Sequence, residues 1–308
     1  MEEFTKALVQ LLQERVGTKV TIDVKEVTKV NDQKLHTINI MEPEDRISRN
    51  YYIEAYYEQY RAGMSIEMIA ENILKYASEK DVVMEKTGLA MVKALYDYEA
   101  IENRLMVKMI SKERNSSYLQ DKVYVDYLDL ACVFCIEIEQ PDNGLATIAV
   151  PQAVYEEWGV SKEELYEKAL SNMEKRFPVL EQDIMEIVGE IYKKYEDDEF
   201  SEFMNPPVMP EVSGMYVVSN ADRLNGASVI LYKDMLKNFA EKHEVKKLYI
   251  LPSSLHEVII IPEDGSLCKD TEMLNEMVVS VNCTQVQAED ILSDHIYVYE
   301  YLSDTVTY

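Results

Sequence analysis

The chain has 308 residues, of which 47% are hydrophobic and 29% charged, the balance of a soluble globular protein with room for two or three domains. Its 57 acidic and 31 basic residues give a formal net charge of −26, which disfavours direct binding of nucleic acid or of anionic membranes, because both depend on Lys and Arg contacts to phosphate. The acidic surface is therefore either a device for solubility or an imitation of DNA phosphates that occupies a DNA-binding partner.

Sequence features also predict where the protein resides. No apolar run is long enough to cross a bilayer, and the acidic N-terminus lacks the basic and apolar regions of a secretory signal. The four cysteines, Cys132, Cys135, Cys268 and Cys283, do not form the dense framework of a small secreted domain. We expect a reduced, cytoplasmic protein without a membrane span.

The first part of the chain predicts a helix followed by a β-hairpin. Apolar residues fall on one face of residues 2–16, and Gly17 ends this helix. Strict alternation over 18–27 predicts a half-buried strand, and 35–40 predicts the returning strand. His36 fits a strand face better than a metal site, since no His or Cys lies at metal spacing nearby.

A tyrosine-rich helix is expected over residues 50–62. Tyr52, Tyr56 and Tyr60 recur at a spacing of four and give this helix an aromatic face. Such a face favours core packing, and a docking surface for a peptide is the alternative. Ser65 starts a second helix.

The middle of the chain predicts a β-hairpin. Residues 101–112 fit a strand or a helix, whereas 124–139 form a long apolar run that Pro141-Asp-Asn-Gly turns into a second strand. Cys132 and Cys135 lie three apart in that first strand, on opposite faces, which favours structural burial over redox or zinc chemistry.

Helices follow the hairpin. A helical segment begins at Pro151 and ends at Gly159, and Ser161-Lys-Glu-Glu forms a capping box for a helix that runs to about residue 175. A further helix is expected over 180–196. The acidic, Pro-containing run from 196 to 210 is the best candidate linker.

The last part of the chain predicts a compact α+β domain. Strands are expected over 215–219, 249–251, 258–261 and 297–301, with helices over 226–243 and 273–281. This β-α-β-β-α-β order is that of a ferredoxin-like unit. The fold class is therefore α+β, with mixed helices and antiparallel sheets. Its predicted domains are 1–100 (helix, hairpin and helical segment), 101–200 (hairpin plus helices) and 211–308 (C-terminal α+β domain).

Four polar residues, Ser253, Ser254, His256 and Glu257, separate the two apolar runs of this domain. A hydrolase would use a serine as nucleophile, His256 as base and Glu257 as the orienting carboxylate. Against this, adjacent strand residues point to opposite faces, and the chain has no Gly-x-Ser-x-Gly elbow here. The alternative is a structural corner in which the serines satisfy backbone groups.

Other polar residues lie at predicted element ends in the same domain, where binding sites often form. We take them as candidate binding residues; they are Asn220, Asp222, Arg223, Asn282 and Asp294, with His295 beside them. No metal site and no cofactor are predicted.

Several blocks of the sequence carry a resemblance to a known family. They are Tyr56-Tyr-Glu-Gln-Tyr-Arg-Ala-Gly63, Tyr127-Leu-Asp-Leu130, Trp158-Gly-Val-Ser-Lys-Glu-Glu-Leu165, Met215-Tyr-Val-Val-Ser-Asn220, Asn225-Gly-Ala227, Leu251-Pro-Ser-Ser-Leu-His-Glu-Val258 and Leu292-Ser-Asp-His-Ile-Tyr297. Together they resemble an uncharacterised protein family of anaerobic gut bacteria, often encoded near mobile elements. The first hairpin departs from that family, which tends to have a Gly-containing Asn-Asn turn where this chain has Asn31-Asp-Gln-Lys34. The resemblance implies an architecture and no mechanism.

The sequence favours a non-enzymatic module that binds or regulates another protein, with an acidic surface that selects basic partners. A hydrolase-like enzyme and an acidic DNA mimic are the alternatives. The oligomeric state stays open.

Overall fold

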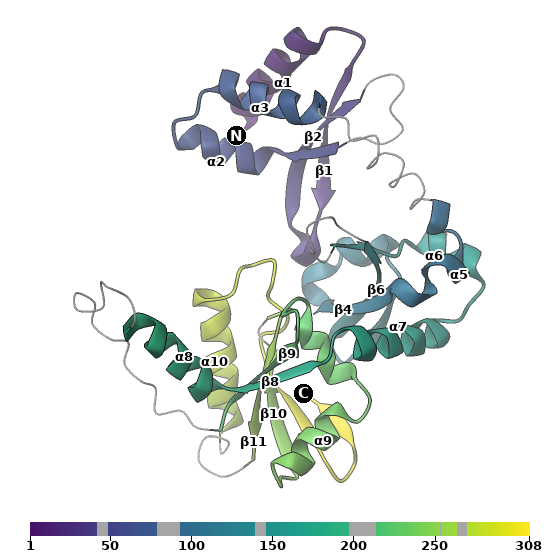
Figure 1. Cartoon of the computed structure of the whole chain (residues 1–308), viewed down its shortest axis with the longest axis vertical. Coiled ribbons are helices and arrows are strands. Elements are labelled where there is room, and N and C mark those ends of the chain that lie inside the picture. Colours follow the sequence, from purple (N-terminus) through teal and green to yellow (C-terminus); the bar gives the residue numbers. More distant parts are fainter. Residues whose placement is uncertain (42–48, 79–92, 139–145, 197–213, 253, 264–269) are drawn as a thin grey trace. The chain divides into compact units, whose positions relative to one another are not determined.

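The computed structural model describes all of the chain except residues 42–48, 79–92, 139–145, 197–213, 253 and 264–269 (Figure 1). It divides into two compact units, Met1–Ile101 and Glu102–Tyr308. The predicted division of the second part into domains 101–200 and 211–308 stays a prediction. Among the described residues, no helix is long and apolar enough to cross a membrane.

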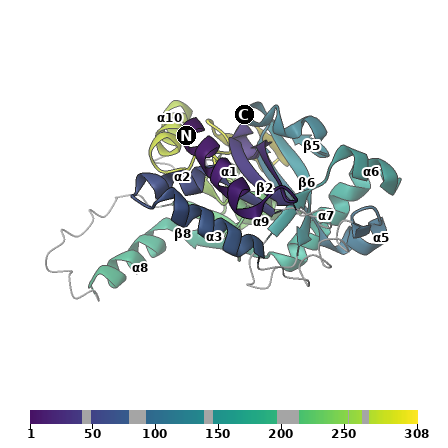
Figure 2. The same ribbon diagram turned by 90° about the horizontal axis from the view of Figure 1, so that it is seen from above.

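The first unit is a three-stranded antiparallel sheet with helices packed on it (Figure 2). Its strand order is β1-β2-β3, so β1 is an edge strand. The core joins Phe4, Leu8 and Leu12 of the first helix to Ile38 and Ile69. Its elements are α1 (Glu2–Val16), β1 (Thr21–Thr28), β2 (Lys34–Met41), β3 (Arg49–Tyr52), α2 (Ile53–Arg61), α3 (Ile66–Ser78) and α5 (Tyr98–Ile101).

The tyrosine-rich segment differs from the prediction at its start. Tyr52 belongs to β3, which pairs with β2, and the helix begins only at Ile53. Strand pairing overrides the helical spacing of the first residues, as tertiary context often does. Farther along, the rings of Tyr57 and Tyr60 pack against Phe4 in tilted orientations, with centroids 5.4 and 5.0 Å from its ring, so this part of the aromatic face does serve packing.

The second unit begins with a four-stranded antiparallel sheet in which β6 is central. Residues 105–111, open between helix and strand in the sequence, form β4. Two helices follow: Gly159 ends α6 in the left-handed conformation, and Ser161 and Glu164 form the expected capping box of α7. The elements are β4 (Leu105–Ser111), β5 (Tyr124–Tyr127), β6 (Leu130–Ile138), β7 (Ala146–Ala149), α6 (Gln152–Trp158) and α7 (Lys162–Arg176). The Pro141-Asp-Asn-Gly turn lies outside the described residues, but the strands on either side of it pair antiparallel.

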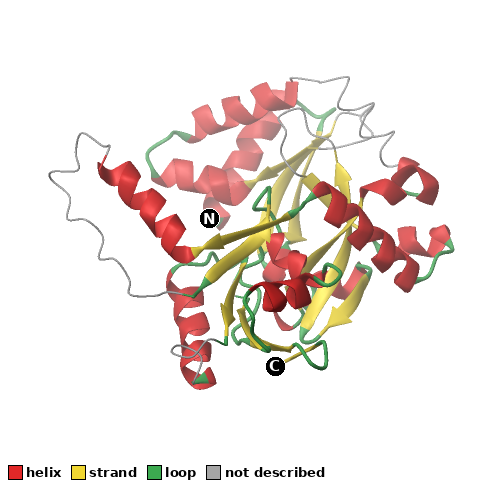
Figure 3. Ribbon diagram, turned by 60° about the horizontal axis from the view of Figure 1, so that its bottom comes forward, coloured by secondary structure: helices red, strands yellow, loops and turns green. Residues whose placement is uncertain are grey.

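The unit continues with a six-stranded sheet in the order β13-β12-β10-β11-β9-β8, drawn in yellow with the other strands in Figure 3. Tyr249 and Ile261 pack with α10 on one face, and Tyr216 meets Phe239 of α9 on the other. The two apolar runs are therefore covered on both faces, as their composition indicates. The elements are β8 (Val179–Asp183), α8 (Ile184–Glu196), β9 (Tyr216–Asn220), α9 (Met235–Lys242), β10 (Lys247–Leu251), β11 (Val258–Pro262), α10 (Thr271–Thr284), β12 (Tyr297–Glu300) and β13 (Thr305–Thr307).

The α+β class is confirmed, whereas the ferredoxin-like arrangement is not. Along the chain, β9, α9, β10, β11, α10 and β12 follow the predicted order. In space, however, the second and third of these strands, β10 and β11, lie at the centre, while a ferredoxin-like sheet centres its first and third. Strands β8 and β13 extend the sheet at both edges.

Two predicted helices are shorter than expected. Residues 179–183 form β8, which pairs with β9, so the helix expected from 180 begins at Ile184. The helix expected over 226–243 is broken: a 3₁₀ segment, Gly226–Leu231, precedes α9, and Asp234 between them has a φ of 56°. The linker predicted from 196 to 210 lies, beyond its first residue, outside the described residues.

Candidate functional site

One polar cluster forms where β9, β10 and the loop before β12 meet; we call Ser219, Asn225, Ser254, His256 and Asp290 the His256 cluster. The backbone N–H of Asn225 donates to His256 Nδ1 at 3.2 Å, and His256 Nε2 lies 3.3 Å from Asp290 Oδ1. Ser254 Oγ accepts from the His256 backbone N–H at 3.0 Å, and Ser219 Oγ donates to the His256 carbonyl at 2.6 Å. The cluster thus holds both the ring and the backbone of His256.

These contacts define what the His256 ring can do. Because Nδ1 accepts a hydrogen bond, the ring proton sits on Nε2, on the side of Asp290. A general base needs an unprotonated nitrogen directed at its substrate, and here that nitrogen is occupied by the Asn225 N–H. The ring therefore fits a structural cross-link between two loops.

The other residues of the predicted hydrolase site are placed as follows. Ser254 is 5% exposed, and its hydroxyl accepts from a backbone N–H and does not contact the imidazole. Glu257 is half-buried and directly precedes β11, so it is not on the strand itself, and the carboxylate near the ring is Asp290. Ser253 lies outside the described residues.

Gly226 allows the cluster to close. A Cβ atom at this position would lie 2.1 Å from Ser219 Oγ, 2.5 Å from the His256 carbonyl oxygen and 2.7 Å from the Asn220 backbone nitrogen. Two of these are backbone atoms, so only glycine permits the approach. Three blocks that carry the family resemblance meet here.

The candidate binding residues at the end of β9 shape a loop. Asn220 donates from its amide to the Leu224 carbonyl at 2.9 Å and accepts from the Leu224 N–H at 3.3 Å. Arg223 has a φ of 53° and binds the Gln182 side chain of β8, whereas Asp222 is exposed. Asn220 therefore acts as a clamp of this loop.

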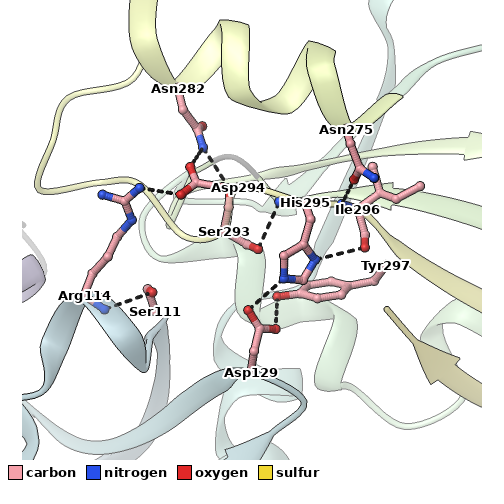
Figure 4. A network of polar contacts seen from close by, with 10 residues as sticks. All are labelled: Ser111, Arg114, Asp129, Asn275, Asn282, Ser293, Asp294, His295, Ile296 and Tyr297. Atoms are coloured by element: carbon pink, nitrogen blue, oxygen red, sulfur yellow. Dashed lines mark hydrogen bonds and ion pairs between the residues drawn. The ribbon is translucent and has the colours of Figure 1, made fainter. Parts of the chain in front are cut away.

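A second set of contacts links the two sheets of the second unit (Figure 4); we call Arg114, Asp129, Asn282, Asp294, His295 and Tyr297 the Asp129 cluster. Asn282 donates to Asp294 Oδ1 and to the Ser293 carbonyl, each at 2.8 Å, and Arg114 binds Asp294 Oδ2. Burial favours the neutral Asp294 carboxyl, but the hydrogen bonds from Asn282 and Arg114 outweigh burial and lower its pKa.

Asp129 is the centre of this set. It lies in the turn between β5 and β6, where Leu128 has a φ of 55°. Its Oδ1 accepts from the Tyr297 hydroxyl at 2.7 Å, and its Oδ2 lies 3.1 Å from His295 Nε2. No local sequence pattern predicts this pairing, since 166 residues separate Asp129 from His295. Both segments are, however, among the blocks that carry the family resemblance, and that resemblance was the one feature of the sequence that marked them.

Each of the four histidines of the chain lies beside a carboxylate. His36 is 3.0 Å from Glu54 and His243 is 3.2 Å from Glu181, in addition to the two contacts above. Within the described residues, no group of three or more His, Cys, Asp or Glu side chains could hold a metal ion. The histidines therefore serve as internal partners of acids.

The Cys132–Cys135 pair matches the prediction of structural burial. Both thiols are buried on β6, and burial raises the pKa of Cys132 to about 12 and that of Cys135 to about 11. Thiols with such pKa values stay protonated and unreactive near neutral pH.

Comparison with known proteins gives one match. The model of a family of unknown function, DUF5688, matches residues 1–301. No curated protein and no solved structure matches significantly. Because the match spans nearly the whole sequence, this chain belongs to the DUF5688 family.

Proposed function

We propose that this protein acts by binding another protein and not by catalysis, and that its acidic surface selects a basic partner. The proposal depends on the contacts of His256, which lies near both a serine, Ser254, and a carboxylate, Asp290. Both of its ring nitrogens are engaged, one by the Asn225 N–H and one toward Asp290. A serine hydrolase keeps one ring nitrogen for the carboxylate and leaves the other, unprotonated, for the nucleophile; here the Asn225 N–H occupies that other nitrogen.

The charge supports the choice of partner. With 57 acidic against 31 basic residues, the chain presents an excess of carboxylates to any approaching molecule. Complementary charge speeds association and suppresses partners of like charge. A basic protein surface is the complement that this excess favours.

A salt-stepped capture experiment tests the proposal. The full chain is immobilised, exposed to lysate of its native host, and washed from about 50 to about 500 mM NaCl, a range that strongly screens surface charge. We expect specific partners that are basic and elute as salt rises. A Ser254→Ala variant should capture the same set. Retention of only acidic or salt-insensitive proteins contradicts the proposal.

Two further arms separate the alternatives. Covalent labelling by a fluorophosphonate probe that is lost in Ser253→Ala or Ser254→Ala would establish a nucleophilic serine and overturn the non-catalytic reading. If duplex DNA displaces the captured partner, the partner binds DNA and this protein at the same surface, which would indicate DNA mimicry.

A further inference from the structure

The open edge of β1 is the feature from which this inference starts. The sheet of the first unit ends at β1, which pairs with β2 and with no other described strand. Most of its eight residues are exposed. Such an edge is a template for a further strand unless it is covered or blunted.

The register shows which backbone groups point outward. Lys29 N–H donates to the Gln33 carbonyl at 2.8 Å, and the same register pairs Val24 with Ile38. Hydrogen-bonded and non-bonded pairs alternate in an antiparallel ladder, so the N–H and C=O groups of Ile22, Val24 and Glu26 face away from β2. No strand among the described residues pairs with these groups, so an added strand could do so.

An apolar groove borders this edge. It has a volume of about 1020 Å³ and runs between one side of α1, including Val9, and the β1–β2 hairpin at Val24 and His36. Val24 stands at the middle of the edge and is 40% exposed. A strand added to β1 would cover Val24 from the side.

The charges next to Val24 identify the strand that fits. Asp23 precedes Val24 and Lys25 follows it, and both point to the face opposite Val24. If two copies of β1 pair antiparallel about a two-fold axis at Val24, Asp23 of each copy faces Lys25 of the other. Opposite charges directly across a strand pair stabilise it, and like charges destabilise it.

We propose that the protein forms a two-fold dimer through antiparallel β1–β1 pairing centred on Val24. The backbone N–H and C=O of Val24 then bond to the C=O and N–H of Val24 in the second copy. Those of Ile22 bond to Glu26 of the second copy. The two three-stranded sheets become one six-stranded sheet, and the interface is isologous, as in most homodimers. This inference is independent of the proposed function.

Charge reversal within the full chain tests the register. Wild type should sediment with about twice the monomer mass of 35.7 kDa. Asp23→Lys places Lys against Lys twice, and Lys25→Asp places Asp against Asp twice. Each variant alone should dimerise with a Kd raised about tenfold or more.

Mixing the two variants supplies the decisive arm. In the mixed pair every Asp faces a Lys again, so equimolar Asp23→Lys and Lys25→Asp chains should form a heterodimer as tight as the wild-type dimer. Glu167→Lys, on the exposed side of α7, carries the same charge change as Asp23→Lys and should dimerise like wild type. Circular dichroism of each variant checks that it is folded.

Three results would overturn the proposal. One is a wild-type chain that stays monomeric at about 100 µM, which limits any dimer to a very weak one. Another is a dimer that both single reversals leave intact, because that dimer uses a different surface. The third is a failure of the mixed, folded variants to associate.

Discussion

At Gly226 the chain leaves no room for a side chain, and the crowding comes largely from backbone. Alanine there would place its Cβ 2.5 Å from the His256 carbonyl oxygen and 2.7 Å from the Asn220 nitrogen. Neither atom can move without shifting a strand end, so we expect Gly226→Ala to lower the free energy of unfolding by about 3 kcal/mol. Urea denaturation of the purified variant measures this loss.

The same substitution elsewhere gives the matched control. Gly189 lies inside α8, and a Cβ atom there meets no atom within 4 Å. Gly189→Ala should therefore raise stability by about 0.5–1 kcal/mol, since alanine favours a helix. Equal effects of the two variants would show that Gly226 is not a close-packed position.

Asp294 gives a pH dependence with a defined sign. Its pKa is lowered in the folded chain, so the unfolded chain binds more protons at this site in acid. Its stabilising contribution is present above the ordinary carboxyl pKa of 3.8 and is lost as pH falls through the folded value. Stability should therefore decline below about pH 4, and Asp294→Asn should reduce this decline by up to about 1 kcal/mol, the range of exposed ion pairs.

Unfolding curves at neutral pH and at successive acidic pH values check this prediction. Asp222→Asn, at an exposed carboxylate in the loop after β9, serves as control and should change stability by less than about 0.5 kcal/mol at either pH. An Asp294→Asn variant that keeps the full acid decline would remove Asp294 as a source of it.

The residues of the two clusters also show which parts of the candidate site can be predicted from the sequence. Ser254 and His256 were evident as polar residues between apolar runs, because a strand boundary is a local pattern. Asp290 and Asp129 were not, because each lies in a loop and its importance comes from a partner far along the chain. Local composition does not report such pairings.

At the scale of elements, helix termini were predicted better than strand edges. Ser161 and Gly159 act through bonds and backbone angles within a few residues, so their roles were evident from the sequence and are confirmed. Residues 179–183 became β8 because β9 offers a free edge, which periodicity alone does not reveal. The same holds for Tyr52 at the edge of β2.

Packing of the β5–β6 turn on β12 gives an element-scale prediction. Tyr297 is fully buried and its hydroxyl donates to Asp129 Oδ1 at 2.7 Å. Tyr297→Phe keeps the ring but leaves a carboxylate oxygen without this donor, so we expect a loss of about 1–2 kcal/mol. Thermal and urea unfolding measure it.

Tyr301 provides a control of the same chemistry at the surface. Its hydroxyl donates to Glu241 at 2.8 Å, but the pair is exposed and water can replace it. Tyr301→Phe should therefore cost clearly less stability than Tyr297→Phe. If both variants behave alike, the Asp129–Tyr297 bond does not help to hold the two sheets together.

At the scale of the whole molecule, the dominant feature is uncompensated negative charge. Even if every Lys and Arg were paired with an acid, a formal charge of −26 would remain. Several Lys and Arg ion pairs among the described residues have both partners exposed, and such pairs contribute about 0–1 kcal/mol each. The long-range repulsion among the excess carboxylates opposes the compact state.

The dependence of stability on salt distinguishes attraction within local ion pairs from long-range repulsion among the excess carboxylates. Raising NaCl to about 0.1 M shortens the screening length to about 10 Å, which weakens repulsion between distant carboxylates far more than attraction between groups in contact. We therefore expect the Tm to rise as NaCl increases from low concentration. Glu167→Lys, which removes part of the excess charge without a described partner, should raise the Tm in low salt and show a smaller salt response. A Tm that falls with added salt would mean that local ion pairs, and not net repulsion, dominate the electrostatic contribution to folding.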